Sequence, residues 1–221
     1  MGTGAGRSSA IQTVFRYPRF DVSIVRKIEA EQLGWPAAGA AGHDSGLGCN
    51  RMYDDLRRLS WAEAKRVFAL EGSLIARMES GADIAEEWAT IEDELSESDQ
   101  GIYGLDLGVA STVVSLSAAK CVPFSSCNAG AFGERHQEIY PLVAFYALAQ
   151  AVKLLSESAE EAAIGLEGND YLVAYADDIR KIREFAQSLI RRSPLFNAIR
   201  TRRSPQPKPK IKEDQYRLAL E

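Results

Sequence analysis

Residues 125–136 hold the densest group of side chains that could perform chemistry. The segment reads Ser-Ser-Cys-Asn-Ala-Gly-Ala-Phe-Gly-Glu-Arg-His. Cys127 could act as a nucleophile once a nearby cation lowers its pKa, and His136 could serve as the base or the orienting group. Glycines let backbone amides approach an anion closely, and ligands of α/β sheets bind beyond the carboxyl ends of strands. We therefore predict a small pocket here, with four further ligand-binding residues: Asn128, Gly130, Gly133 and Arg135.

The sequence around this segment resembles other proteins over a short stretch. A helical pattern, the apolar run Ala-Ala-Lys-Cys-Val-Pro-Phe and the turn Ser-Ser-Cys-Asn-Ala-Gly follow one another up to residue 130. This order resembles uncharacterised bacterial α/β proteins with a helix–strand–Ser-Cys-x-Gly turn. It is distantly similar to the Ser-Ser-Cys-x-Gly turn of the wybutosine-synthesis tRNA methyltransferases. The resemblance implies that the loop is a site. The alternative is structural, with Cys127 a small buried residue and the glycines turning the chain.

Zinc is a second possibility for the thiols and imidazoles. They lie in two patches, His43 with Cys49, and Cys121 with Cys127 and His136. These spacings are longer than the Cys-x-x-Cys of a zinc knuckle, and a predicted strand separates the cysteines of the second patch. We therefore predict no cofactor, with zinc as an alternative.

A pair of carboxylates offers a different chemistry. Tyr-Ala-Asp177-Asp178 resembles the Tyr-x-Asp-Asp motif of reverse transcriptases, in which carboxylates hold two Mg²⁺ ions. Asp106, in Gly-Leu-Asp-Leu-Gly, could supply a third carboxylate. The corresponding alternative function is metal-dependent processing of nucleic acid by these three residues. The simpler interpretation is that Asp178 caps a helix and Asp177 interacts with the helix dipole.

Four regions are expected to position these residues. Residues 1–19 read as a flexible arm. Residues 20–98 read as a helical region that contains a Gly-rich loop at 36–50. Residues 99–192 read as an α/β domain, and residues 193–221 form a basic, Pro-containing tail.

The helical region has two clear patterns. Apolar residues at helical spacing predict a short helix between Asp21 and Gly34. A capping box at Ser60 and Glu63, and the same pattern at Asp83, predict a helical hairpin over residues 60–98 with an acidic outer surface.

From residue 101 onward, apolar runs alternate with helical patterns. Strands are expected at 102–107, 121–126, 140–147 and 171–176, and helices at 109–119, at 149–163 and after Asp178. This alternation predicts an α/β fold, with α+β as the alternative. We expect an N-terminal helical hairpin followed by a small sheet of three or four strands with covering helices.

The net charge of −5 conceals a strong segregation of charge. Residues 71–179 carry a net charge of −16, whereas residues 180–212 carry +10. We predict a partner protein, or a second copy of the chain, that binds through the acidic 71–100 surface and the basic 180–212 stretch. Nucleic acid is the alternative partner, because Lys and Arg neutralise phosphates. The candidate partner-binding residues are Arg200, Arg202, Arg203, Lys208, Lys210 and Lys212.

Composition limits the class of protein. A hydrophobic content of 46% is enough for a core, and three cysteines make no disulfide framework. No apolar run approaches the ~20 residues of a membrane span, and the N-terminus lacks the apolar core of a signal peptide. Arginine outnumbers lysine, a hint of a bacterial source. We expect a soluble, cytoplasmic accessory or binding protein that acts through protein–protein contacts and the 125–136 pocket. The alternative is a small enzyme that uses Cys127 and His136.

Overall fold

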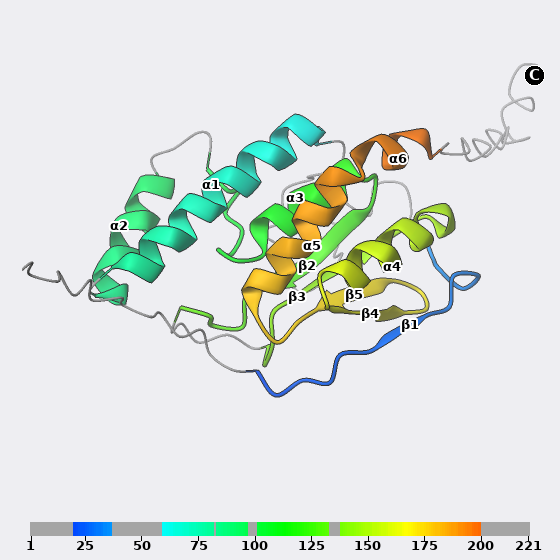
Figure 1. Ribbon diagram of the computed structural model, residues 1–221, viewed down its shortest axis with the longest axis horizontal. Coiled ribbons are helices and arrows are strands. Elements are labelled where there is room, and N and C mark those ends of the chain that lie inside the picture. The colour runs from blue at the N-terminus through cyan, green and yellow to red at the C-terminus, as the bar shows by residue number, and fades with distance from the viewer. Residues whose placement is uncertain (1–19, 37–58, 82, 97–100, 133–137, 200–221) are drawn as a thin grey trace, which may run out of the picture.

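The computed structural model describes residues 20–36, 59–81, 83–96, 101–132 and 138–199 (Figure 1). Five strands form one sheet in the order β1-β4-β5-β3-β2. β1 runs parallel to β4, and every other neighbouring pair is antiparallel. The predicted α/β class is confirmed, with five strands in place of three or four. The strands are β1 (Arg26–Ile28), β2 (Val122–Cys127), β3 (Leu142–Tyr146), β4 (Gly165–Gly168) and β5 (Leu172–Tyr175).

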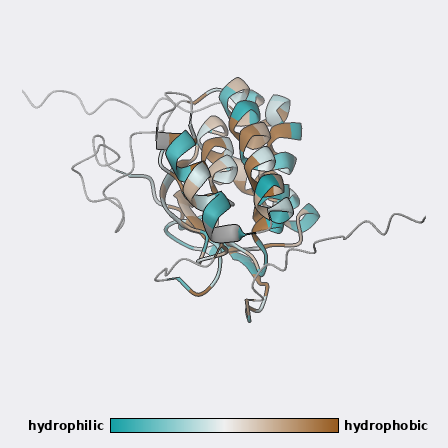
Figure 2. Cartoon of the chain, turned by 90° about the vertical axis from the view of Figure 1, so that its left-hand side faces the viewer, coloured by the Kyte–Doolittle hydropathy of each residue, from teal (hydrophilic) through white to brown (hydrophobic). Residues whose placement is uncertain are grey.

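The described helices lie together on one side of the sheet (Figures 1 and 2). α3, α4 and α5 form a layer against the strands, and α1 packs on α3 and α5 from outside. All nine residues of α3 are buried, because this helix lies between the sheet and α1. None of the described helices combines the length and the apolar character that a membrane span needs. The helices are α1 (Trp61–Ser80), α2 (Ile84–Ser96), α3 (Ala110–Ala118), α4 (Val152–Glu161), α5 (Ile179–Arg191) and α6 (Ser193–Ala198), with a short 3₁₀ helix at Ala149–Ala151 before α4.

One hydrophobic core joins the N-terminal helices to the sheet. Ala64 and Val67 of α1 belong to the same fully buried cluster as Val113 of α3, Phe145 of β3 and Phe185 of α5. Residues 20–98 and 99–192 therefore share a core, and β1 brings the first of these regions into the sheet itself.

The predicted helix between Asp21 and Gly34 is wrong. This segment contributes β1 and then turns at residues 30–32, and the amide of Leu166 donates a hydrogen bond of 2.9 Å to the carbonyl of Val25. The Arg26 guanidinium crosses to the end of α4, where it donates to the carbonyls of Ala159 and Ile164. Pairing with a distant strand outweighs the local helical pattern here.

The predicted strand at 102–107 is also wrong, because the chain turns there. Tyr103 and Gly104 both have positive φ angles, of 63° and 64°, which no strand accommodates. The extended tail expected from residue 193 begins as helix α6, in which Pro194 lies in the first turn and Phe196 is buried. The ring of Phe196 packs 5.9 Å from that of Trp61, so apolar contact with α1 holds this helix.

Other local predictions are confirmed by the structure. The hydroxyl of Ser60 accepts the amide of Glu63 at 3.1 Å, and the carboxylate of Asp83 accepts the amide of Glu86 at 3.2 Å, as capping patterns require. The helix predicted at 109–119 and the strands predicted at 121–126, 140–147 and 171–176 correspond to α3, β2, β3 and β5.

Candidate functional site

The two predicted sites lie at the same end of the sheet. Strand register places Cys127 at the end of β2 beside Leu142, and Leu142 beside Tyr175 at the end of β5. The segment after Tyr175 carries the predicted carboxylates, and Asp106 approaches from the turn before α3. The backbone amide of Asn128 donates to the Asp106 carboxylate at 3.3 Å. The fold thus brings Cys127, Asn128 and Asp106 together.

Asn128 ties this loop to the turn before α3. Its side chain is fully buried, and its amide nitrogen donates to the carbonyl of Leu107 at 3.0 Å. Its side-chain oxygen accepts the backbone amide of Gly130 at 2.9 Å. Gly130 has a φ of 71°, a left-handed conformation that suits glycine and closes the turn. In the part of the loop that the structure describes, Asn128 and Gly130 thus have a structural role.

The surroundings of Cys127 favour a neutral thiol. Only 8% of the residue is exposed, and its Sγ accepts the backbone amide of Ala129 at 3.3 Å. Burial raises the pKa of Cys127, and the negative charges of Asp106 and Glu138 raise it further. A nucleophilic cysteine needs the opposite effect. Three other predicted residues, Gly133, Arg135 and His136, lie outside the described residues.

Apolar packing surrounds the end of the described loop. Phe132 stacks on Trp88 of α2, with ring centroids 6.0 Å apart and an interplanar angle of 9°. Phe132 shares a small second core with Leu107 and with Ile179 at the start of α5. The loop therefore connects the helical hairpin to the end of the sheet.

The Asp177–Asp178 pair serves the start of α5. Asp178 caps the helix by accepting the backbone amide of Arg180 at 2.8 Å, and its carboxylate also pairs with the Arg180 side chain. Asp177 pairs with Lys181 at 2.7 Å. The helix-cap interpretation is confirmed. In the described ranges, no group of three or more His, Cys, Asp or Glu side chains could hold a metal ion, so the geometry gives the magnesium alternative no support.

The described cysteines do not form a zinc site in these ranges either. Cys121 and Cys127 are both buried and lie at opposite ends of β2. Burial raises the pKa of Cys121 to about 12, which disfavours the thiolate that zinc requires. The other predicted patch, His43 with Cys49, lies outside the described residues.

Cations in the described part of the basic 180–212 stretch make ion pairs within the chain. Glu161 of α4 pairs with both Arg191 and Arg192, and these contacts with that of Ser188 lower the pKa of Glu161 to about 2. Arg183 lies over the ring of Phe68 at 3.9 Å. These contacts engage cations of residues 180–192 within the chain, and the binding of a partner by this stretch stays a prediction. The six predicted partner-binding residues, Arg200, Arg202, Arg203, Lys208, Lys210 and Lys212, lie outside the described residues.

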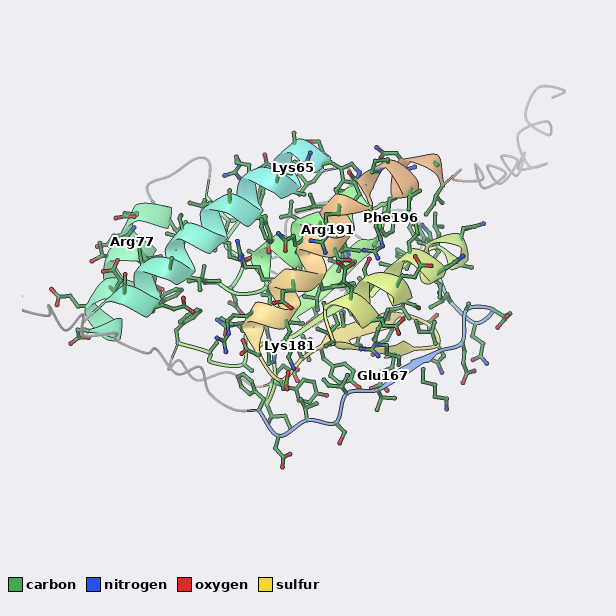
Figure 3. All side chains as sticks on the ribbon, viewed as in Figure 1. Lys65, Arg77, Glu167, Lys181, Arg191 and Phe196 are labelled. Carbon is green, nitrogen blue, oxygen red and sulfur yellow. The ribbon has the colours of Figure 1, made fainter. Side chains whose placement is uncertain are left out.

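The acidic surface of the hairpin is also partly compensated. Arg77 of α1 (Figure 3) pairs with Glu87 at 2.8 Å and with Glu94 at 2.6 Å, both on α2. Glu86 and Glu92 of α2 are exposed. The ion pairs of Arg77 with Glu87 and Glu94 hold the two helices of the hairpin together.

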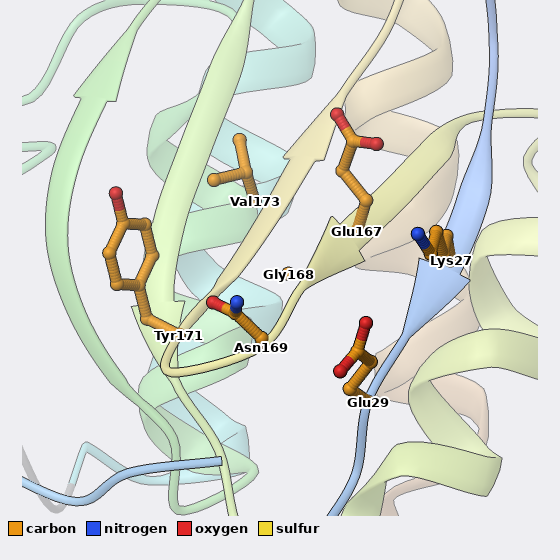
Figure 4. Close-up of a pocket in the computed structure, with 7 residues that line it drawn as sticks. All are labelled: Lys27, Glu29, Glu167, Gly168, Asn169, Tyr171 and Val173. Atoms are coloured by element: carbon orange, nitrogen blue, oxygen red, sulfur yellow. The ribbon is translucent and has the colours of Figure 1, made fainter. Parts of the chain in front are cut away.

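A pocket that the sequence does not predict lies on the opposite side of the sheet from the helices (Figure 4). We call this side, on which none of the described helices lies, the helix-free face. Lys27, Glu167 and Val173 stand beside one another across β1, β4 and β5, and they line the pocket. The pocket has a volume of about 360 Å³, within the range of small ligand sites. Its other lining residues are Glu29, Gly168, Asn169 and Tyr171.

The lining residue Tyr171 belongs to an aromatic cluster. Phe124 lies 5.1 Å from Tyr146 and 5.1 Å from Tyr171, measured between ring centroids. Tyr171 is 41% exposed. Trp35, which is 50% exposed, follows Gly34, whose amide donates to the carbonyl of Asp170 at 2.8 Å.

The amino-acid sequence does not predict the pocket, because the patterns of β1 and β4, two of its three strands, do not indicate strands. The segment between Asp21 and Gly34 is predicted to be a helix, and β4 is too short and too rich in glycine to be recognised. The turn Gly168-Asn169-Asp170 between Leu166 and Leu172 is the one feature that could have indicated a hairpin.

Comparisons with protein-family models, with curated proteins and with solved structures found no match.

Proposed function

We propose that this protein is a binding protein that contacts a partner polypeptide through the helix-free face of its sheet. The observation that carries the proposal is the exposed ring of Tyr171, which packs on Phe124 and Tyr146 beside a 360 Å³ pocket. Exposed tyrosine side chains that are held in place and bordered by charged residues are typical of the energetic centre of a protein interface. The function is the one that the sequence predicts, but on a different surface.

The residues that were predicted to perform chemistry lie at the other end of the sheet, and their surroundings favour a binding function over catalysis. Cys127 has a raised pKa, and Asp177 and Asp178 are engaged in ion pairs of the first turn of α5. The contacts of Asn128 and Gly130 stabilise a turn. The contacts of these residues thus stabilise the fold. The exposed part of the Tyr171 ring adds no such stabilisation.

Site-specific photocross-linking tests this proposal. Benzoylphenylalanine replaces Tyr171 in one variant and Leu195 in a second, matched variant, and both are expressed in the native host. Leu195 is 54% exposed and lies on α6, on the side of the helices. We expect a discrete cross-linked polypeptide from position 171 that is absent from position 195, identified by mass spectrometry.

The result that would overturn the proposal is equally direct. Cross-linking that is absent at position 171, or that has the same pattern at both positions, would show that the helix-free face has no specific partner. Circular dichroism of both variants checks that each one is folded.

A further inference from the structure

We infer that the pocket on the helix-free face binds the guanidinium group of an arginine side chain on the partner. This inference rests on the proposed function and names the chemistry of its central contact. The charges of the pocket lead to it. Glu29 and Glu167 contribute two carboxylates, Lys27 contributes one ammonium group, and no other lining residue is charged. The pocket therefore carries one excess negative charge, which one cationic side chain would balance.

The two carboxylates have different surroundings. The side-chain amide of Gln32 donates to Glu29, which leaves the other carboxylate oxygen of Glu29 as an acceptor. Glu167 lies near the hydroxyl of Tyr175, which donates to the carbonyl of Ser23 at 3.4 Å and accepts the backbone amide of Val25 at 3.1 Å. Glu29 and Glu167 come from neighbouring segments and flank the pocket (Figure 4). A guanidinium group has donors in a planar fork that can reach two such acceptors at once.

The aromatic wall of the pocket suits the same ligand. Tyr171 meets Phe124 edge-on at 87° and Tyr146 at 67°, so two neighbours fix the orientation of its ring. A cation over the face of such a ring is stabilised by the ring quadrupole, and guanidinium stacks on it better than ammonium does. Val173 adds an apolar surface for the aliphatic stem of the ligand.

Substitution of Lys27 tests the inference, because it should strengthen the binding of arginine rather than weaken it. In the described part of the chain, Lys27 makes no ion pair, and it is exposed at the pocket. Its ammonium group would repel an incoming cation while partly neutralising the two carboxylates. Removal of this charge should therefore tighten the binding of arginine. In a pocket that binds an anion, the same change would weaken the binding of that anion.

The test is a titration followed by ¹H–¹⁵N correlation NMR, with N-acetyl-L-arginine amide as the probe. We expect saturable shifts at the backbone amides of residues 27–29 and 167–173. N-acetyl-L-citrulline amide, a neutral molecule of almost the same shape, should bind about tenfold more weakly because it lacks the charge. Added salt should weaken only the arginine probe.

Four variants complete the test. Glu167→Gln should weaken the arginine probe about fivefold to tenfold, and Tyr171→Leu about threefold. Lys27→Gln should tighten it a few-fold. Glu160→Gln, an exposed glutamate on α4, is the matched control and should leave binding unchanged.

The inference would be overturned by equal affinity for arginine and citrulline probes, by weaker binding in Lys27→Gln, or by no shifts at a probe concentration of about 20 mM. If a specific cross-link forms at position 171 but the arginine probe fails, the face is an interface and only the ligand chemistry is wrong. If the cross-link fails as well, the proposed function itself is wrong.

Discussion

Glu71→Ala should remove a substantial part of the stability of this fold. Glu71 is fully buried in α1, and its carboxylate accepts the backbone amide of Gly108 at 3.0 Å and the hydroxyl of Ser111. Arg183 lies 3.9 Å away. The first residues of α3 have no cap of their own, because Val109 occupies the N-cap position. Glu71 therefore caps α3 from a different helix.

The magnitude follows from the groups that the substitution leaves without a partner. A buried donor that loses its acceptor costs about 1–3 kcal/mol, and Glu71→Ala affects both Gly108 and Ser111. The substitution also removes the carboxylate that faces the Arg183 guanidinium. We expect the free energy of unfolding to fall by about 3–5 kcal/mol in Glu71→Ala. The loss should be smaller in Glu71→Gln, about 1–2 kcal/mol, because the amide keeps one acceptor oxygen.

The pH dependence of stability provides a second measurement. Burial raises the pKa of Glu71 above its ordinary value of 4.5. A carboxyl whose pKa is higher in the folded state stabilises that state fully below the ordinary pKa, and this contribution is lost as pH rises through the folded pKa. The advantage of the wild type over Glu71→Gln should therefore be largest at acidic pH and shrink as pH rises above 4.5.

Urea denaturation followed by circular dichroism measures both effects, with Glu160→Gln as the exposed control. A loss below about 1 kcal/mol in Glu71→Ala would refute the capping role, since one unsatisfied buried donor alone costs that much. If the difference in unfolding free energy between the wild type and Glu71→Gln grows with pH, the direction of the pKa shift is refuted.

Three further predictions concern other parts of the fold. The pKa of Glu161 is lowered to about 2, so the stability that Glu161→Gln loses should be present above pH 4.5 and vanish as pH falls toward 2, measured by urea denaturation across pH. Gly165→Val should lower the free energy of unfolding by about 1–3 kcal/mol, because an added Cβ would lie 2.3 Å from the Tyr175 ring; an unchanged thermal midpoint would contradict this. Iodoacetamide should alkylate Cys127 at least about tenfold more slowly than it alkylates glutathione at pH 8, because the raised pKa of Cys127 keeps its thiol neutral. Mass spectrometry follows both reactions, and equal rates would support the hypothesis of a nucleophilic Cys127.

Candidate sites were less predictable than secondary structure. The sequence places the 125–136 segment beyond a strand end, whereas its contact with Asp106 and the burial of Cys127 come from the tertiary structure. The type of a residue indicates which chemistry it could perform. Its protonation state depends on burial and on charges that come from other parts of the chain.

The amino-acid sequence by itself determined the elements whose causes are local. The caps at Ser60, Asp83 and Asp178 involve residues two or three positions apart, and the apolar runs of β2, β3 and β5 identify buried strands. Only the tertiary structure decided that Arg26–Ile28 pairs with β4, that Glu71 of α1 caps α3, and that Lys27, Glu167 and Tyr171 share a pocket. The physical reason is the range of the interactions. A cap or a helical period is satisfied within one turn of the chain, whereas a strand partner, a buried carboxylate and a pocket wall are supplied by residues far away in the sequence.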